Sequence, residues 1–177
     1  MITIQTGKKN RRYNKNMLPA HSYLDQSGIP YHTATFPTST PKGAAQVAQV
    51  LGLKEHQAIK TLIFETDKGE SMLVMVGGDQ NVISGHLKKV VGSRNIQLAS
   101  PERVVQVTGY MIGSIPPFSW QPEGFRSFLD LEMIDESMLA VGAGVWGNEI
   151  LITPANLVTA CRAIVVNLTN RDKPIFP

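Results

Sequence analysis

Two apolar runs near the middle of the chain, residues 57–65 and 71–76, are separated by the short turn Asp67-Lys68-Gly69. A glycine-bearing turn between two such runs predicts an antiparallel hairpin. Other helices and strands are predicted in irregular alternation around it. The helices cover residues 17–26, 41–51, 82–91, 100–107 and 153–161, and the strands cover 29–36, 96–98, 126–133, 138–141, 149–152 and 164–168. This order favours an α+β fold with a mixed sheet over a doubly wound parallel sheet.

The size and composition of the chain predict one soluble domain. It has 177 residues, of which 42% are hydrophobic and 18% are charged, and such a chain can bury a full core. No window approaches the roughly 20 apolar residues that a bilayer requires, and the N-terminus lacks a signal-peptide pattern. Cys161 is the only cysteine, which fits a reducing compartment. We therefore expect a cytoplasmic protein without membrane association.

We expect the single domain to cover residues 17–170, preceded by a basic flexible arm over 1–16 and followed by a tail over 171–177. The formal net charge is +3, and the arm carries five of the cations, Lys8, Lys9, Arg11, Arg12 and Lys15. Like-charged termini are usually solvated and mobile. The functional alternative is an arm that contacts phosphates and adds salt-dependent affinity for RNA.

The segment Gly113-Ser114-Ile115-Pro116-Pro117 ends an apolar run with a glycine and a proline pair. Glycine allows positive φ, whereas proline fixes its own φ and restricts the residue before it. The result is a stiff loop that presents backbone N–H groups, which suit an oxyanion or a phosphate. A tight surface turn between two strands is the simpler alternative.

This loop within Gly109–Pro117, together with Lys60 in Ala58-Ile59-Lys60-Thr61-Leu62, resembles the YbaK/prolyl-tRNA synthetase editing-domain family. The resemblance runs from about Ile29 to about Leu168. It implies a mixed, strongly curved, barrel-like sheet surrounded by helices. It also implies a trans-acting hydrolase that deacylates mischarged aminoacyl-tRNA, with no metal or organic cofactor. The implied amino acid is small, such as cysteine or alanine, the implied RNA is tRNA-Pro, and prolyl-tRNA synthetase is a candidate partner.

The resemblance implies catalytic roles for Lys60, Gly113 and Ser114, with the lysine holding the 3′-terminal nucleotide or the ester carbonyl. Without the resemblance, Lys60 would be interpreted as a lysine pointing outward from an edge strand. The implied substrate-binding residues are Phe36, Ile115, Pro116, Pro117, Gly142, Gly144 and Glu149. Phe36 departs from the family, since some Cys-tRNA deacylases carry tyrosine there. Core packing explains this phenylalanine equally well.

Residues 142–147 spell G-x-G-x-x-G, which invites a dinucleotide-binding interpretation. A strand rather than a helix is predicted after it, and no acidic residue follows about 20 positions later, so we reject that interpretation. A glycine-rich hairpin bordering the pocket is favoured instead. Glu149 is then either part of the pocket wall or a solvated carboxylate at a strand end.

Other nucleophiles and ligands have weaker support. Cys161 has no histidine beside it in the sequence and is predicted to be a buried thiol, and the four histidines show no metal-ligand spacing. The competing function is a non-catalytic module that docks aminoacyl-tRNA or a synthetase without turnover. The sequence predicts no oligomeric state.

Overall fold

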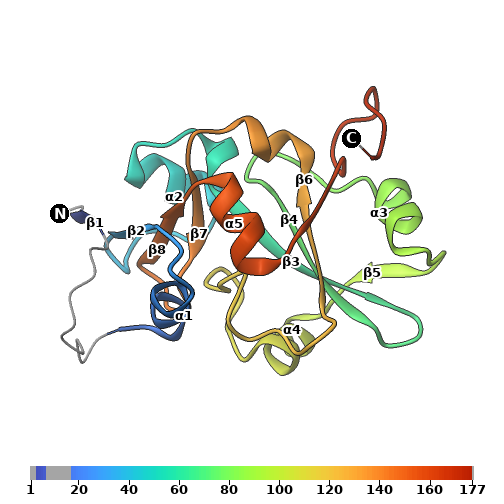
Figure 1. The fold of residues 1–177 in the computed structure, drawn as a ribbon, viewed down its shortest axis with the longest axis horizontal. Coiled ribbons are helices and arrows are strands. Elements are labelled where there is room, and N and C mark those ends of the chain that lie inside the picture. Colours follow the sequence, from blue (N-terminus) through green and yellow to red (C-terminus); the bar gives the residue numbers. More distant parts are fainter. Residues whose placement is uncertain (1–2, 7–16, 177) are drawn as a thin grey trace.

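The computed structural model describes residues 3–6 and 17–176 and confirms the α+β class (Figure 1). A five-stranded sheet has the order β5 (Ile96–Leu98), β3 (Ile59–Thr66), β4 (Ser71–Gly77), β6 (Arg126–Asp130) and β9 (Ile164–Val166). The pairs β5–β3 and β3–β4 are antiparallel, whereas β4–β6 and β6–β9 are parallel. The sheet is therefore mixed, as predicted, and the predicted hairpin is β3–β4.

A second, antiparallel sheet has the order β1 (Thr3–Thr6), β2 (His32–Thr35), β8 (Asn148–Ile152) and β7 (Leu139–Gly142). An isolated parallel bridge between Ala58 and Ala140 connects the two sheets. The described strands thus form two sheets rather than the one that was expected, because β3 and β7 pair at this bridge alone.

The helices are α1 (Pro19–Ser27), α2 (Ala44–Leu51), α3 (Ser84–Val91), α4 (Pro101–Thr108) and α5 (Pro154–Cys161). Their ends follow the sequence signals. Ser100 and Thr153 cap α4 and α5 by accepting from the backbone N–H three residues on, and Gly28 and Gly52 end α1 and α2 in the left-handed conformation. In the described part of the chain, no helix is long and apolar enough to span a membrane.

Each sheet is covered on both faces. The main core combines residues of both sheets with α1, α4 and α5, and includes Leu24, Leu73, Val104, Ile150 and Leu157. The outer face of the five-stranded sheet packs against α3 through Leu87. The outer face of the other sheet packs against α2 through Val47 and Leu51.

Three sequence predictions need correction. Helix α2 begins at Ala44 rather than residue 41, since Gly43 has a φ of 143° and lies outside the helix. The strand predicted over 126–133 ends at Asp130, whose side chain accepts from Glu132 N and starts the 3₁₀ helix η2 (Leu131–Asp135). Strand β1 lies inside the segment predicted as a flexible arm. The five cations of that arm lie outside the described residues.

Candidate active site

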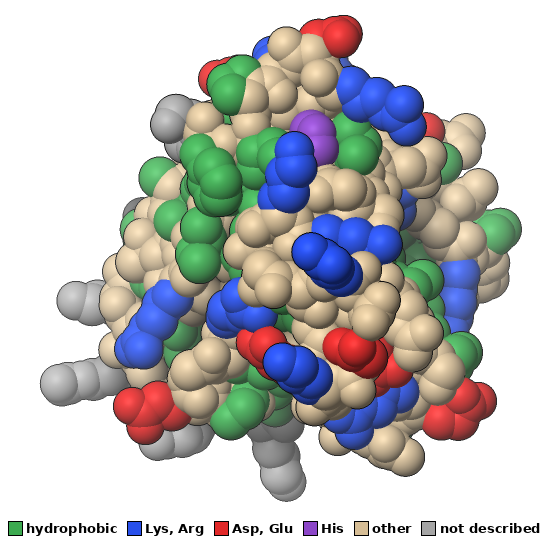
Figure 2. All heavy atoms as spheres, turned by 90° about the vertical axis from the view of Figure 1, so that its right-hand side faces the viewer, with side chains coloured by type: hydrophobic (Ala, Val, Ile, Leu, Met, Phe, Trp, Pro, Cys, Tyr) green, Lys and Arg blue, Asp and Glu red, His purple; other side chains and the backbone are tan. Residues whose placement is uncertain are grey.

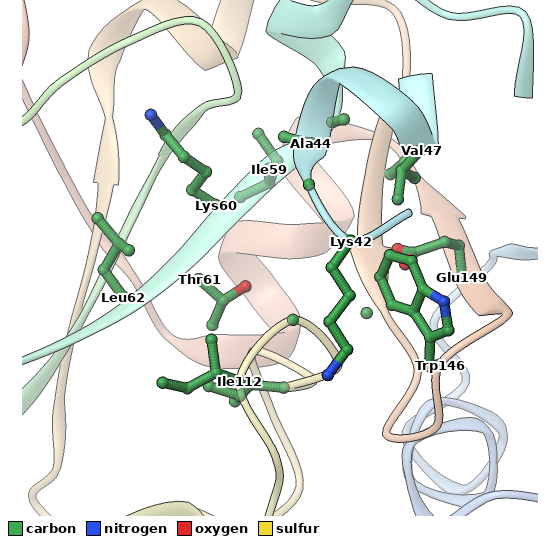
Figure 3. Close-up of a pocket in the computed structure, with 16 residues that line it drawn as sticks. Lys42, Ala44, Val47, Ile59, Lys60, Thr61, Leu62, Ile112, Trp146 and Glu149 are labelled. Atoms are coloured by element: carbon green, nitrogen blue, oxygen red, sulfur yellow. The ribbon is translucent and has the colours of Figure 1, made fainter. Parts of the chain in front are cut away.

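A cavity of about 330 Å³ lies where the two sheets diverge beyond the Ala58–Ala140 bridge (Figure 3). Its walls come from four parts of the chain: the start of α2, strand β3, the loop that contains Gly113, and the β7–β8 hairpin. Most of the lining is apolar, including Val47, Ile59, Ile115, Ala140 and Trp146. The polar and charged side chains of the lining are those of Lys42, Lys60, Thr61 and Glu149.

One edge of β3 is open beside this cavity. The Ile63 carbonyl accepts from Ala99 N, on the edge where β5 pairs. Because backbone groups alternate between the two edges of a strand, the N–H and C=O of Thr61 face the same edge. Strand β5 has ended by this point, and its last pair is Phe64–Leu98. The Thr61 backbone therefore offers the cavity one donor and one acceptor.

The predicted Gly113–Pro117 loop is held from both sides. Gly113 has a φ of 90°, and residues 114–117 are buried behind it. The indole of Trp120 donates to Pro116 O at 2.6 Å, and the amide of Gln121 donates to Pro117 O at 2.6 Å. These bonds fix the carbonyls on the far side of the loop. The loop is thus anchored by two side-chain hydrogen bonds.

The N–H groups of this loop differ in availability. Ser114 N already donates to Met111 O at 3.2 Å, and the two prolines have none. The N–H groups of Gly113 and Ile115 have no backbone acceptor among the described residues. Both of these residues line the cavity. They are the two donors that the loop can offer a ligand.

The glycine-rich hairpin packs directly against the loop. Gly144 N donates to Ser114 O at 2.9 Å. A Cβ on Gly142 would lie 2.9 Å from Ser114 C, and a Cβ on Gly144 would lie 2.8 Å from a ring carbon of Tyr110. Glycine is required at both positions because of this close approach. Two of the predicted site segments therefore meet.

Five of the ten predicted site residues line the cavity: Lys60, Gly113, Ile115, Gly142 and Glu149. The other five are not part of the lining: Phe36, Ser114, Pro116, Pro117 and Gly144. Phe36 is buried and packs edge-on against Trp146, with ring centroids 5.1 Å apart. Its contact with a lining residue agrees with the core-packing interpretation.

Lys60 reaches the cavity, but its ammonium group does not face the loop. On β3 it shares a face with Leu62 and Phe64, which pack in the cluster under α3, whereas Ile59 and Ile63 face the main core. The ammonium donates to Gln80 O. Figure 3 shows the side chain extending away from Trp146 and Glu149. Lys60 and Gly113 thus line one cavity, but the ammonium points away from the loop.

Lys42 is a cation at the cavity that the sequence analysis missed. It precedes α2, and its stem lies over Gly113, since a Cβ there would be 3.8 Å from Lys42 Cδ. Figure 3 shows its side chain running between Ile112 and Trp146. Trp146 Nε1 donates to Thr40 O at 3.2 Å and so holds the segment that carries this lysine. The sequence signal was the position of Lys42 between Pro41 and Gly43, directly before an apolar helix.

Glu149 is buried in the cavity wall, with 5% of its surface exposed. Its neighbours in register, Ala34 on β2 and Gly142 on β7, have no polar side chain. Burial raises the pKa of this carboxyl to about 8. The alternative of a solvated strand-end carboxylate is excluded. Cys161 is also buried, and burial raises the pKa of its thiol to about 12, which makes it a poor nucleophile.

The molecule is thus an α+β domain in which an N–H-bearing loop and two lysines border a mostly apolar cavity. A model of the aminoacyl-tRNA editing domain matches residues 38–160, which is more than half of the chain. The chain therefore belongs to the aminoacyl-tRNA editing domain family.

Individual relatives agree with this assignment. A candidate Cys-tRNA(Pro)/Cys-tRNA(Cys) deacylase of Enterococcus faecalis is 23% identical over 84% of this chain and 91% of its own length. A proline–tRNA ligase of Desulforamulus reducens is 37% identical over 59% of this chain but only 18% of the ligase. A solved structure described as a candidate trans-editing enzyme for prolyl tRNA synthetase superposes with a TM-score of 0.77 at 26% identity, over 86% of this chain and 95% of that one.

Proposed function

We propose that this protein hydrolyses the ester bond of mischarged aminoacyl-tRNA, releasing a small amino acid such as cysteine or alanine, with tRNA-Pro as the RNA. The observation that carries the proposal is the Gly113–Pro117 loop beside a mostly apolar cavity of about 330 Å³. The family assignment and the names of the relatives support it. Prolyl-tRNA synthetase is the proposed partner, because its sequences contain a matching segment.

The chemistry needs little from the protein. An aminoacyl ester is already activated, so orientation and stabilisation of the developing oxyanion are sufficient. In our mechanism the N–H groups of Gly113 and Ile115 donate to the ester carbonyl oxygen. Water attacks the carbonyl carbon, the bond to the ribose oxygen breaks, and that oxygen takes a proton. The products are the free amino acid and the deacylated tRNA.

Lys60 is proposed to hold the 3′-terminal nucleotide rather than the carbonyl. Its ammonium is turned away from Gly113, whereas the phosphate of a terminal nucleotide must stay outside the apolar cavity because of its charge. A lysine at the rim suits a phosphate as a point charge. Lys42, whose stem lies over Gly113, is proposed as the cation nearer to the ester.

A second basic surface would contact the body of the RNA. Lys88, Lys89, Gly92, Ser93 and Arg94 surround a shallow hollow at the end of α3. Figure 2 shows Lys and Arg side chains gathered on this side of the molecule, interspersed with acidic ones. The basic arm of residues 1–16 would add to this salt-dependent attraction. We further propose that residues 17–170 form the domain together with strand β1, with a tail over 171–177. We also propose that the two sheets are continuous, as in a barrel, and that the protein works in the cytoplasm.

The test is deacylation of a panel of mischarged tRNAs by the wild-type protein and by two matched variants, Lys60→Met and Lys42→Met, which keep the stems and remove the charges. We expect the wild type to release cysteine or alanine and Lys60→Met to lose on the order of a hundredfold in kcat/KM, mainly through a raised KM, as when one partner of a charge pair is truncated. Unchanged hydrolysis in Lys60→Met would contradict its proposed role. Binding of aminoacyl-tRNA without turnover would identify a docking module instead.

A further inference from the structure

Within residues 3–6 and 17–176, the carboxyl of Glu149 has no hydrogen-bond or ion-pair partner. Among the described residues it makes no ion pair, and no hydrogen bond from another side chain or from a backbone outside the strands reaches it. Neither of the two cavity lysines forms an ion pair with this carboxyl. Lys60 donates to Gln80 O, and Lys42 is exposed, with no ion pair to an acidic side chain of the described chain.

This situation is costly, because an ionised carboxyl without a counter-charge is poorly tolerated away from water. The side chain nevertheless stands on β8 opposite Ala34 and Gly142, and it opens toward the cavity rather than into the core. Val47 and Trp146 line the same cavity, and in Figure 3 the side chain of Glu149 extends on their side of it, opposite Lys60. It is the acidic residue of the cavity lining, so it can distinguish a cationic ligand from a neutral one.

We propose that Glu149 binds the α-ammonium group of the aminoacyl ester, so that the substrates are esters with a free α-amino group. This inference rests on the proposed deacylase function. The geometry supports it in two ways: Glu149 lies on the β7–β8 hairpin that packs on the Gly113–Pro117 loop, and Glu149, Gly113 and Ile115 all line one cavity. The ammonium and the carbonyl of an aminoacyl group are separated by a single carbon, so one small cavity can hold both.

The proton balance of this step is simple. Burial raises the pKa of Glu149 to about 8, so the empty site holds a carboxylic acid near neutral pH. An α-amino group has an ordinary pKa near 7.7–8.0 and arrives as an ammonium. The complex then contains one carboxylate and one ammonium, and one proton goes to solvent. No covalent bond forms or breaks.

The experiment uses 3′-alanylamino-3′-deoxyadenosine, an amide that replaces the labile ester, and the same compound acetylated on its α-amino group. Calorimetry measures the binding of both to the wild type, to Glu149→Gln and to the control Glu123→Gln, which changes an exposed carboxyl elsewhere. We expect the wild type and the control to bind the free amine more tightly, on the order of tenfold, as for a desolvated charge pair. Glu149→Gln is expected to bind both compounds equally.

Three results would overturn the inference: equal binding of both compounds by the wild type, binding of neither, or retention of the preference in Glu149→Gln. The comparison of the two compounds on wild-type protein needs no variant and stands even if Glu149→Gln does not fold. Deacylation of Ala-tRNA, measured in parallel, separates the two proposals. Hydrolysis without an amine preference leaves the function and removes the role of Glu149, whereas a preference without hydrolysis leaves the role and removes the enzyme.

Discussion

Two buried carboxyl groups of this protein differ in the hydrogen bonds that they accept. Asp130, at the end of β6, is fully buried and accepts from Leu168 N at 2.7 Å, Thr169 Oγ1 at 3.0 Å and Glu132 N at 3.1 Å. Glu149 is nearly as buried, and none of the described residues donates a hydrogen bond to its carboxyl. A carboxylate whose hydrogen bonds are complete fixes the chain around it. One that is left without donors beside a cavity is instead available to a ligand.

The Asp130 region is also connected to the site. Glu132 accepts from Gln80 Nε2 at 2.7 Å, and Gln80 O accepts from the ammonium of Lys60. The amide of Asn170 lowers the pKa of Glu132 by hydrogen bonding, and Lys173 and Gln80 act in the same direction. Asn170, in the segment after β9, donates to Glu132, and Glu132 accepts from the side chain of Gln80. The segment therefore helps to position Gln80, whose backbone carbonyl accepts from Lys60.

The largest loss of stability is expected from Asp130→Asn. The amide nitrogen cannot accept from Leu168 N or Thr169 Oγ1, so one or two bonds to a charged group are lost and a buried donor is left unsatisfied. We expect a loss of about 3–4 kcal/mol in the free energy of unfolding, measured by urea denaturation. Asp172→Asn, at an exposed carboxyl of the same segment, is the control. A loss below about 1 kcal/mol would show that the network adds little.

Glu149→Gln is expected to raise the free energy of unfolding rather than lower it. Between the ordinary value of 4.5 and the raised pKa of about 8, the folded protein retains a proton that the unfolded chain releases. Wild-type stability therefore falls as the pH rises through this range. Lys42 and Lys60 also line the cavity, and His32 lies on the same sheet face from β2.

Because glutamine has no ionisable group, the variant should match the wild type near pH 4.5 and exceed it by about 4–5 kcal/mol at pH 8.5, since each unit of the pKa difference is worth about 1.36 kcal/mol. Unfolding by urea at these two pH values measures the difference. A gain that is the same at both would mean that packing, not ionisation, is responsible. The variant that stabilises the fold should also lose the amine preference, so stability and function change in opposite directions at this one residue.

A third prediction concerns the contact between the hairpin of Glu149 and the loop. Gly142→Ala places a methyl group within 3.0 Å of Ser114 C and near Ser114 O, both of which are backbone atoms. We expect a loss of about 1–2 kcal/mol and a fall in deacylation, since the loop must move away. Gly85→Ala in α3 meets nothing within 4 Å and should be neutral or slightly stabilising. Normal activity in Gly142→Ala would show that the loop position is not critical.

Local features were predictable from the sequence, whereas the direction of the side chains at the site was not. The hairpin turn and the glycines that end α1 and α2 depend on neighbouring residues. The side of β3 on which Lys60 lies depends on which strand face packs under α3, and this is set by pairing between distant segments. Lys42 was missed for the same reason, since only the folded chain brings it over Gly113.

The smallest effect on stability is expected from Glu132→Gln. Its carboxyl is partly exposed, so replacing its charge-assisted bonds by neutral ones should cost less than about 1 kcal/mol. The substitution should affect tRNA binding more than stability. Glu132 accepts from the side chain of Gln80, and Gln80 O accepts from the ammonium of Lys60. We expect weaker binding of tRNA, seen as a raised KM, with kcat little changed. Lys173→Met removes the ion-pair partner of Glu132 without touching Gln80, and an equal rise in KM there would assign the effect to the segment after β9 rather than to this carboxyl.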